Sequence, residues 1–117
     1  MGRLSTHVLD IAHGKPARAI RIALFALAGL ARRKIAEAFT NADGRTDAHL
    51  MGGECYRPGA YELLFHAGDY FRALGTETAD PAFLDVVPVR FHLAEPDGHY
   101  HVPLLVSPWS YSTYRGS

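Results

Sequence analysis

Two histidines near the end of the chain, His99 and His101, are the residues whose type and spacing first indicate chemistry. In an extended strand, side chains two positions apart project from the same face, with their Cα atoms about 7 Å apart. Imidazole can accept and donate a proton near neutral pH, because its ordinary pKa lies close to neutrality. The pair therefore suits acid-base catalysis. Spacing alone leaves open the alternative of two solvent-facing histidines.

A metal site is the third interpretation of this pair. Zinc requires three or four ligands, and the spacing of the other residues offers no obvious third ligand. The sequence also contains no phosphate-cradling glycine loop, no zinc quartet and no Gly-x-Ser-x-Gly motif. We therefore predict no metal ion.

The segment that carries the histidines is rich in groups that recognise ligands. The last nineteen residues contain two histidines, four aromatic residues and an arginine. The ends of most small domains are polar and weakly constrained. We therefore expect this C-terminal segment to form part of a site.

Other residues could take part only if folding brings them to the same place. His7 lies in the first predicted strand, and Arg45 follows a predicted turn, where an arginine is usually a solvated charge. Convergence of these two with His101 would strengthen the catalytic interpretation, but sequence spacing cannot decide it. Cys55, in a glycine-rich loop, and Ser117, with no local base, are poorer nucleophiles. The remaining histidines are expected to be surface or packing residues: His13, His49, His66 and His92.

The elements that must position these residues are predicted to be mainly strands. Period-2 alternation and turn signals at spacings of 8 to 12 residues indicate seven or eight strands in a β-sandwich. Strands are expected over 4–10, 19–28, 32–40, 61–65, 85–94, 99–106 and 109–114. The alanines and leucines of 19–28 would also suit a helix, but its short length and β-branched start favour a strand. Asx and Gly residues over 41–44 favour a tight turn just before Arg45. A short helix is expected over 70–74, with Asp69 as its N-cap.

Composition sets the class of protein. A chain of 117 residues suits one domain, here 1–117, and twelve basic residues balance twelve acidic ones. Because no basic block is present, nucleic acid is an unexpected partner. The near-zero charge permits self-association, and a single cysteine rules out an intrachain disulfide framework.

Two segments imitate membrane signals. The first six residues fit a permissive myristoylation pattern without a second anchor, and the uncharged run 22–31 is too short to span a bilayer. We therefore predict no membrane association. A cytoplasmic location is the default expectation.

Five segments together resemble a known family over nearly the whole chain. They are Leu-Ser-Thr-His-Val-Leu-Asp at 4–10, Thr-Asn-Ala-Asp-Gly-Arg at 40–45, Phe-Leu-Asp-Val-Val-Pro-Val-Arg-Phe at 83–91, His-Tyr-His-Val-Pro-Leu-Leu at 99–105 and Tyr-Arg-Gly-Ser at 114–117. On these residues the chain resembles the 5-hydroxyisourate hydrolases, the transthyretin-like enzymes of urate breakdown.

The resemblance implies a fold, an assembly and a site. The implied fold is all-β, a transthyretin-like sandwich of two four-stranded sheets with one short helix, assembled as a homotetramer whose active sites open into a channel at the dimer-dimer interface. The implied catalytic residues are His7, Arg45 and His101. The residues implied to bind substrate are His7, Arg45, His99, Tyr114, Arg115, Gly116 and Ser117.

The implied reaction is the hydrolytic opening of a cyclic amide in 5-hydroxyisourate. Its product is 2-oxo-4-hydroxy-4-carboxy-5-ureidoimidazoline, and neither a metal nor an organic cofactor is expected. The alternative is a transthyretin-type carrier that binds a small hydrophobic molecule in the same channel without chemistry. That branch lacks the His7, Arg45, His101 and Tyr-Arg-Gly-Ser set that this chain retains.

Overall fold

A four-stranded antiparallel sheet of order β5-β4-β7-β8 forms one layer of the computed structural model, which describes residues 2–116. Its strands are β4 (Arg21–Ala28), β5 (Ala31–Phe39), β7 (Gly59–His66) and β8 (Val86–Leu93). In β8, Val87 and Val89 are buried while Pro88 and Arg90 are exposed, so the period-2 pattern gives this strand one core face.

The opposite layer is built on two chain segments that run side by side. The first contains β1 (Arg3–Ser5) and β2 (Val8–Asp10), and the second contains β9 (His99–His101) and β10 (Leu104–Val106). β1 pairs in parallel with β9, and β2 pairs in parallel with β10. The short strands β3 (Lys15–Pro16), β6 (Met51–Gly52) and β11 (Tyr111–Thr113) complete two sheets, β6-β1-β9 and β11-β10-β2-β3.

Both segments are interrupted at the same level, where the layer divides into its two sheets. Pro103 lies at this level and has no N–H to contribute to a ladder. Hydrogen bonds still join the segments there, from Val102 N to Ser5 O and from Leu104 N to His7 O, both 2.9 Å. The predicted alternation persists through the break in the first segment, where Ser5 and His7 are half-buried between buried neighbours, whereas in the second segment Pro103 is buried as well.

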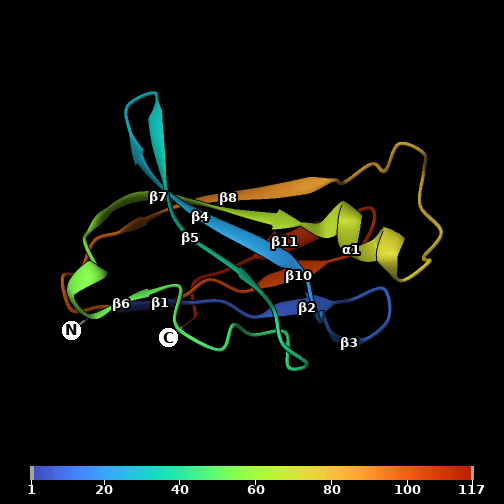
Figure 1. Cartoon of the computed structure of the whole chain (residues 1–117), viewed down its shortest axis with the longest axis horizontal. Coiled ribbons are helices and arrows are strands. Elements are labelled where there is room, and N and C mark those ends of the chain that lie inside the picture. Colours follow the sequence, from blue (N-terminus) through green and yellow to red (C-terminus); the bar gives the residue numbers. More distant parts are fainter. Residues whose placement is uncertain (1, 117) are drawn as a thin grey trace.

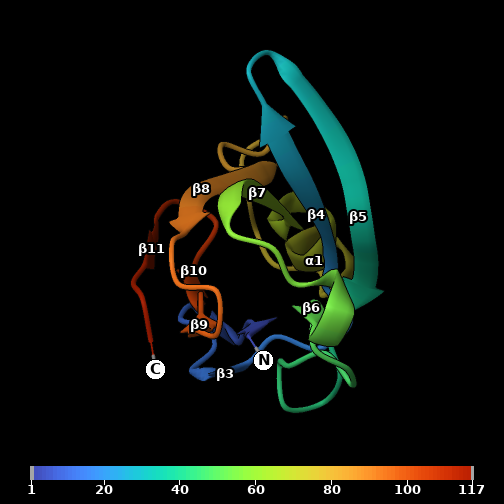
Figure 2. The same ribbon diagram turned by 90° about the vertical axis from the view of Figure 1, so that its left-hand side faces the viewer.

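The two layers enclose a common core (Figures 1 and 2). Fully buried side chains come from both layers, including Leu4, Val8, Leu104, Leu24, Leu63 and Phe65. The helix α1 (Ala67–Ala73) lies at one end of the sandwich and buries Tyr70 and Phe71, and the 3-10 helix η1 (Gly53–Cys55) follows β6. The core therefore depends on contacts between residues far apart in sequence.

The predicted all-β sandwich with one short helix is confirmed, with three differences. The second layer is split into two sheets, and short pairings raise the number of strands to eleven in residues 2–116. The prediction that Asp69 caps the helix is wrong: α1 begins at Ala67 directly after β7, with His66 as its N-cap residue. Asp69 lies inside the first turn and pairs with Arg72 instead.

Candidate active site

His7 and His101 come together at the break in the β1/β9 layer. His7 lies in the link between β1 and β2, and His101 is the last residue of β9. Their ring centroids are 6.5 Å apart with the planes inclined by 42°, and both residues are half-buried. The structure thus brings together two imidazoles that are separated by most of the chain.

Arg45 is carried to the same place by a loop tied to β2. The carbonyl of Gly44 accepts a hydrogen bond of 2.8 Å from Val8 N, one residue beyond His7. Gly44 has a φ of +75°, and a Cβ there would lie 2.4 Å from the carbonyl oxygen of Val8. Only glycine suits this approach, both for its φ and for its lack of a side chain. The following residue, Arg45, is therefore held beside the histidine pair.

The side chain of Asn41 shapes this loop. Its Oδ1 accepts hydrogen bonds from the backbone N–H of Asp43 at 2.9 Å and of Arg45 at 3.2 Å. The Asn41 N–H in turn donates to the carbonyl of Arg45 at 2.7 Å. An Asx side chain in this role replaces the regular backbone ladder that the loop lacks. The predicted turn over 41–44 is confirmed.

The surroundings of His101 favour its neutral form. Burial is the main cause, and electrostatic interactions with Arg45 and then with His7 add to it, so the pKa of His101 lies below its ordinary value of 6.5. Desolvation and like charges both disfavour the imidazolium. At neutral pH, His101 is therefore a neutral imidazole able to accept a proton.

The His101 ring is also held from two sides. The Ser5 hydroxyl lies 2.9 Å from Nδ1, and Gly116 forms an antiparallel bridge with His101. A Cβ on Gly116 would lie 3.0 Å from His101 Cδ2, so the tail passes close to the ring. Sequence reasoning missed Ser5. Its position two residues before His7, on the same strand face, was the available signal.

A cleft of about 270 Å³ opens beside Arg45. Its lining is Arg3, Ser5, Thr6, Arg45, Thr46, Asp47, Ala48 and His49. His49, predicted to have no role, therefore lies in the wall next to the candidate catalytic arginine. The lining is polar and carries two arginines, Arg3 and Arg45, against one carboxylate, Asp47, which suits a small polar substrate that becomes negatively charged.

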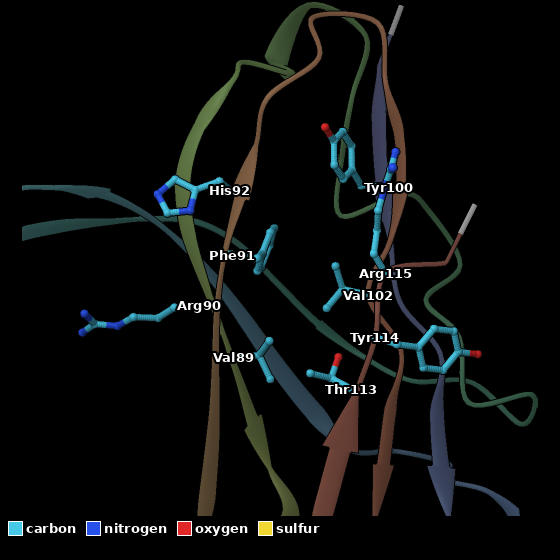
Figure 3. Close-up of a pocket in the computed structure, with 9 residues that line it drawn as sticks. All are labelled: Val89, Arg90, Phe91, His92, Tyr100, Val102, Thr113, Tyr114 and Arg115. Carbon is cyan, nitrogen blue, oxygen red and sulfur yellow. The ribbon is translucent and has the colours of Figure 1, made fainter.

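Two of the predicted substrate-binding residues lie elsewhere in the single chain. The Arg115 guanidinium lies 4.2 Å from the centre of the Tyr100 ring, on the core side of β9, away from His101. Arg115 and Tyr114 line a second pocket of about 270 Å³, with Val89, Phe91 and Tyr100 (Figure 3). The Tyr114 ring points away from Phe91 and Val89 in this view. Tyr114 is 60% exposed.

The other predicted residues have more limited contacts. His99 is exposed at the start of β9, opposite Arg3 on β1. Ser117 lies outside the described residues. Within 2–116, no group of three or more His, Cys, Asp or Glu side chains is arranged to hold a metal ion. In the same range, no helix has the length and apolar character needed to cross a membrane.

The arrangement can activate water. A neutral imidazole can remove a proton, a second imidazole can orient or donate one, and a fixed guanidinium can stabilise negative charge on an attacked carbonyl oxygen. Two histidines and an arginine supply these functions. The geometry therefore suits hydrolysis of an amide or a related carbonyl compound.

Comparisons with known proteins point the same way. The model of the HIUase/Transthyretin family matches residues 4–116. A relative from Rhizobium meliloti, "5-hydroxyisourate hydrolase 2", is 59% identical over 116 residues, which cover 99% of this chain and 97% of the relative.

Solved structures with the same fold include two enzymes and a transthyretin bound to thyroxine. The 5-hydroxyisourate hydrolase of Klebsiella pneumoniae has a TM-score of 0.83 and 33% identity, with both chains fully covered. Sea bream transthyretin in complex with thyroxine has a TM-score of 0.85 and 29% identity, covering 97% of this chain and 94% of the other. An (S)-allantoin synthase has a TM-score of 0.94 and 48% identity, covering 99% of this chain, which spans only 44% of that longer one.

Proposed function

The chain belongs to the HIUase/Transthyretin family, and from this premise we propose that it hydrolyses 5-hydroxyisourate with His7, Arg45 and His101 as catalytic residues. The identity of 59% to a curated hydrolase over nearly the full length supports the substrate. The observation that carries the chemistry is the His7–His101 pair beside Arg45, with His101 held neutral.

The reaction opens a cyclic amide with water. His101 takes a proton from a water molecule while the oxygen of that water bonds to the carbonyl carbon. Arg45 stabilises the oxyanion that forms. The carbon–nitrogen bond of the ring then breaks, and the departing nitrogen takes up the proton that His101 accepted from water. The product, 2-oxo-4-hydroxy-4-carboxy-5-ureidoimidazoline, carries the new carboxylate. His7 orients the water or the substrate from the other side of the pair.

The depressed pKa supports His101 as the base. A general base must be unprotonated at the working pH, and burial together with Arg45 and His7 keeps His101 in that form. Arg45 suits the electrophilic role, because its guanidinium stays charged and its loop is fixed by Gly44 and Asn41. Preorganised donors of this kind typically contribute about 3 to 4 kcal/mol to lowering the barrier.

The tail and the assembly complete the proposal. We propose that residues 1–117 form a single domain that assembles as a homotetramer, in which Tyr114, Arg115, Gly116 and Ser117 line the substrate pocket. Exposed aromatic side chains support an assembly, including Phe83 at 67%, Trp109 at 58% and Tyr114 at 60%.

Sedimentation velocity at several concentrations should give a tetramer. Deletion of 114–117 should impair turnover much more than folding, and an active truncated tetramer would contradict this role of the tail.

One assay tests the activity directly. 5-Hydroxyisourate is generated freshly from urate with urate oxidase, and its ultraviolet absorbance is followed with and without the protein. We expect decay much faster than the spontaneous rate, and a rate equal to the spontaneous one would refute the proposal. The Arg45→Ala variant, purified in the same way, shows whether a contaminating enzyme accounts for the decay.

The carrier remains the competing function for this fold. A carrier would bind a small molecule without consuming it, as the thyroxine complex of sea bream transthyretin illustrates for that protein. The identity to the curated hydrolase is 59%, against 29% to this transthyretin. The carrier would also leave the desolvated His101 beside Arg45 without a use.

A further inference from the structure

Ser5 makes a side-chain contact with the candidate base that the reaction described above does not yet use. Its Oγ lies 2.9 Å from Nδ1 of His101, and the pair is partly buried. The two residues are register partners in the parallel β1/β9 pairing, and Val102 N donates to the Ser5 carbonyl at 2.9 Å. Backbone pairing thus fixes the hydroxyl opposite the ring.

The contact occupies one ring nitrogen and leaves the other for chemistry. A hydroxyl can either donate to Nδ1 or accept a proton from it. If it donates, the neutral ring carries its proton on Nε2 and cannot accept another there. If it accepts, Nε2 holds the lone pair, and the Nδ1–H bond persists after the ring is protonated. Only the second arrangement serves a base that gains a proton at Nε2.

We propose that Ser5 is a positioning residue that accepts the Nδ1 proton of His101, which fixes the ring and leaves the Nε2 lone pair free to take a proton from water. This inference rests on the proposed function for its kinetic consequence. The tautomer itself can be measured without any turnover.

The location of Ser5 separates this role from a structural one. Its neighbour Leu4 faces the core, whereas Ser5 faces the same side as His7 and lines the cleft beside Arg45. A buried threonine outside this cleft, Thr40, makes a structural bond from its Oγ1 to the carbonyl of Ala17 at 2.6 Å. Thr40→Val is therefore a control that removes a buried hydroxyl without touching the bond to His101.

The sign of the pH effect follows from the bond. The Nδ1–H bond to Ser5 is stronger when the ring is charged, so its loss lowers the pKa of His101 further. The ionisable groups around the ring are His7 from the β1–β2 link, Arg45 from its loop and His99 on the same strand. The Ser5→Ala substitution leaves these groups in place. Gly116, in the C-terminal tail, also approaches the ring but carries no charged side chain. The acid limb of the pH–kcat/KM profile should therefore move to lower pH.

The kinetic test compares wild type, Ser5→Ala, Ser5→Thr and Thr40→Val. We expect Ser5→Ala to lower kcat about tenfold with little change in KM, and Ser5→Thr to retain most of the activity. Thr40→Val should lose stability but keep the wild-type acid limb. A wild-type kcat and an unmoved limb in Ser5→Ala would overturn the proposal. A change in KM alone would do so too, since it would make Ser5 a substrate contact.

The tautomer test uses imidazole nitrogen NMR of ¹⁵N-labelled protein at a pH above the pKa of His101. The expected result is a protonated Nδ1 and a bare Nε2 in wild type, with this preference lost in Ser5→Ala. A bare Nδ1 in wild type refutes the inference even if hydrolysis is observed. A protonated Nδ1 in a protein without hydrolytic activity refutes the proposed function and leaves the Ser5–His101 arrangement standing.

Discussion

His101 and His13 are both hydrogen-bonded through Nδ1, but their partners differ in charge. His101 Nδ1 lies 2.9 Å from the Ser5 hydroxyl, and His13 Nδ1 lies 2.6 Å from a carboxylate oxygen of Asp10. A neutral partner beside a desolvated ring leaves the proton available for transfer. A buried carboxylate instead holds the ring as a structural tie. The two sites show that the partner of Nδ1 and the surrounding charge decide what a histidine does.

The Asp10 site connects β2 to the helix. Asp10 is fully buried, and its Oδ1 accepts from the backbone N–H of Ala12 and His13, both 3.0 Å away. Its Oδ2 also accepts from the Tyr70 hydroxyl of α1 at 2.8 Å. Burial opposes ionisation of Asp10, but the hydrogen bonds from Tyr70 and His13 outweigh it and lower the pKa of the carboxyl. The catalytic and structural clusters thus lie only a few residues apart along β1 and β2.

This comparison predicts that activity and stability can be removed separately, and Arg45 gives the largest effect. Arg45→Ala should lower kcat by at least about a hundredfold, because the oxyanion loses its fixed positive charge. The midpoint of thermal unfolding should change little, since the Arg45 side chain is exposed. Steady-state kinetics and thermal unfolding of the same preparation measure both quantities.

Arg33→Ala is the matched control, since Arg33 is an exposed arginine on β5 in the opposite layer. It should keep the wild-type kcat and stability. Near-normal turnover in Arg45→Ala would contradict the catalytic role of Arg45.

Asp10→Ala should show the reverse pattern. The change leaves the Tyr70 hydroxyl and two backbone N–H groups without their buried acceptor, and we expect a loss of about 3 kcal/mol in the free energy of unfolding. The kcat of the folded fraction should stay within about threefold of wild type, because Asp10 faces the core. Urea unfolding measures the first quantity and turnover below the unfolding range the second.

The pH dependence of the Asp10 contribution gives a second test. Because the folded pKa lies below the ordinary value of 3.8, the stabilisation is complete above that pH and is lost as pH falls through the folded pKa. The stability difference between wild type and Asp10→Ala should therefore shrink in acid. Asp69→Ala, which removes an exposed carboxylate from α1, should be nearly neutral. An Asp10→Ala protein of unchanged stability would contradict the structural assignment.

Gly116→Ala sharpens the comparison with a smaller change. The added Cβ would lie 3.0 Å from His101 Cδ2 and 3.2 Å from its Cβ, so the ring must shift by a few tenths of an ångström. We expect kcat to fall a few fold while the unfolding midpoint changes little, because catalytic geometry is more sensitive to such displacements than packing at an exposed edge. Unchanged kcat together with an unmoved His101 ring resonance would show that the tail does not constrain the base.

Strand alternation predicted local features of the site well. It placed His99 and His101 on one face, because side-chain direction in a strand alternates from one residue to the next. Alternation could not predict that His7 lies beside His101, or that Arg45 lies beside these two histidines. Those contacts depend on the parallel β1/β9 pairing and on the bond from Val8 N to Gly44 O, between segments far apart in the chain.

The one wrong prediction and the features that the sequence did not reveal share this origin. Asp69 fitted the N-cap pattern, but β7 continues directly into α1 and the helix starts three residues earlier than predicted. His13 showed no signal in the sequence, because its importance comes from Asp10 being buried under Tyr70 of a distant helix. Arg115 belongs to a motif next to Gly116, yet its side chain lies on the opposite face of β9 from His101. Burial and long-range pairing, which decide these cases, are properties of the fold.

The smallest predicted effect is on the pH dependence of stability near His101. Because its folded pKa is below 6.5, the unfolded chain binds more protons between the two values, so stability falls as pH drops from 6.5 through the folded pKa. The change is at most about 1.4 kcal/mol for each pH unit that separates the two pKa values. His101→Gln should flatten this part of the profile, and His99→Gln, at an exposed position, should not. If the free energy of unfolding varies with pH equally in wild type and in His101→Gln, the fold does not hold His101 neutral. The contrast between His101 and His13 then rests on hydrogen bonding alone.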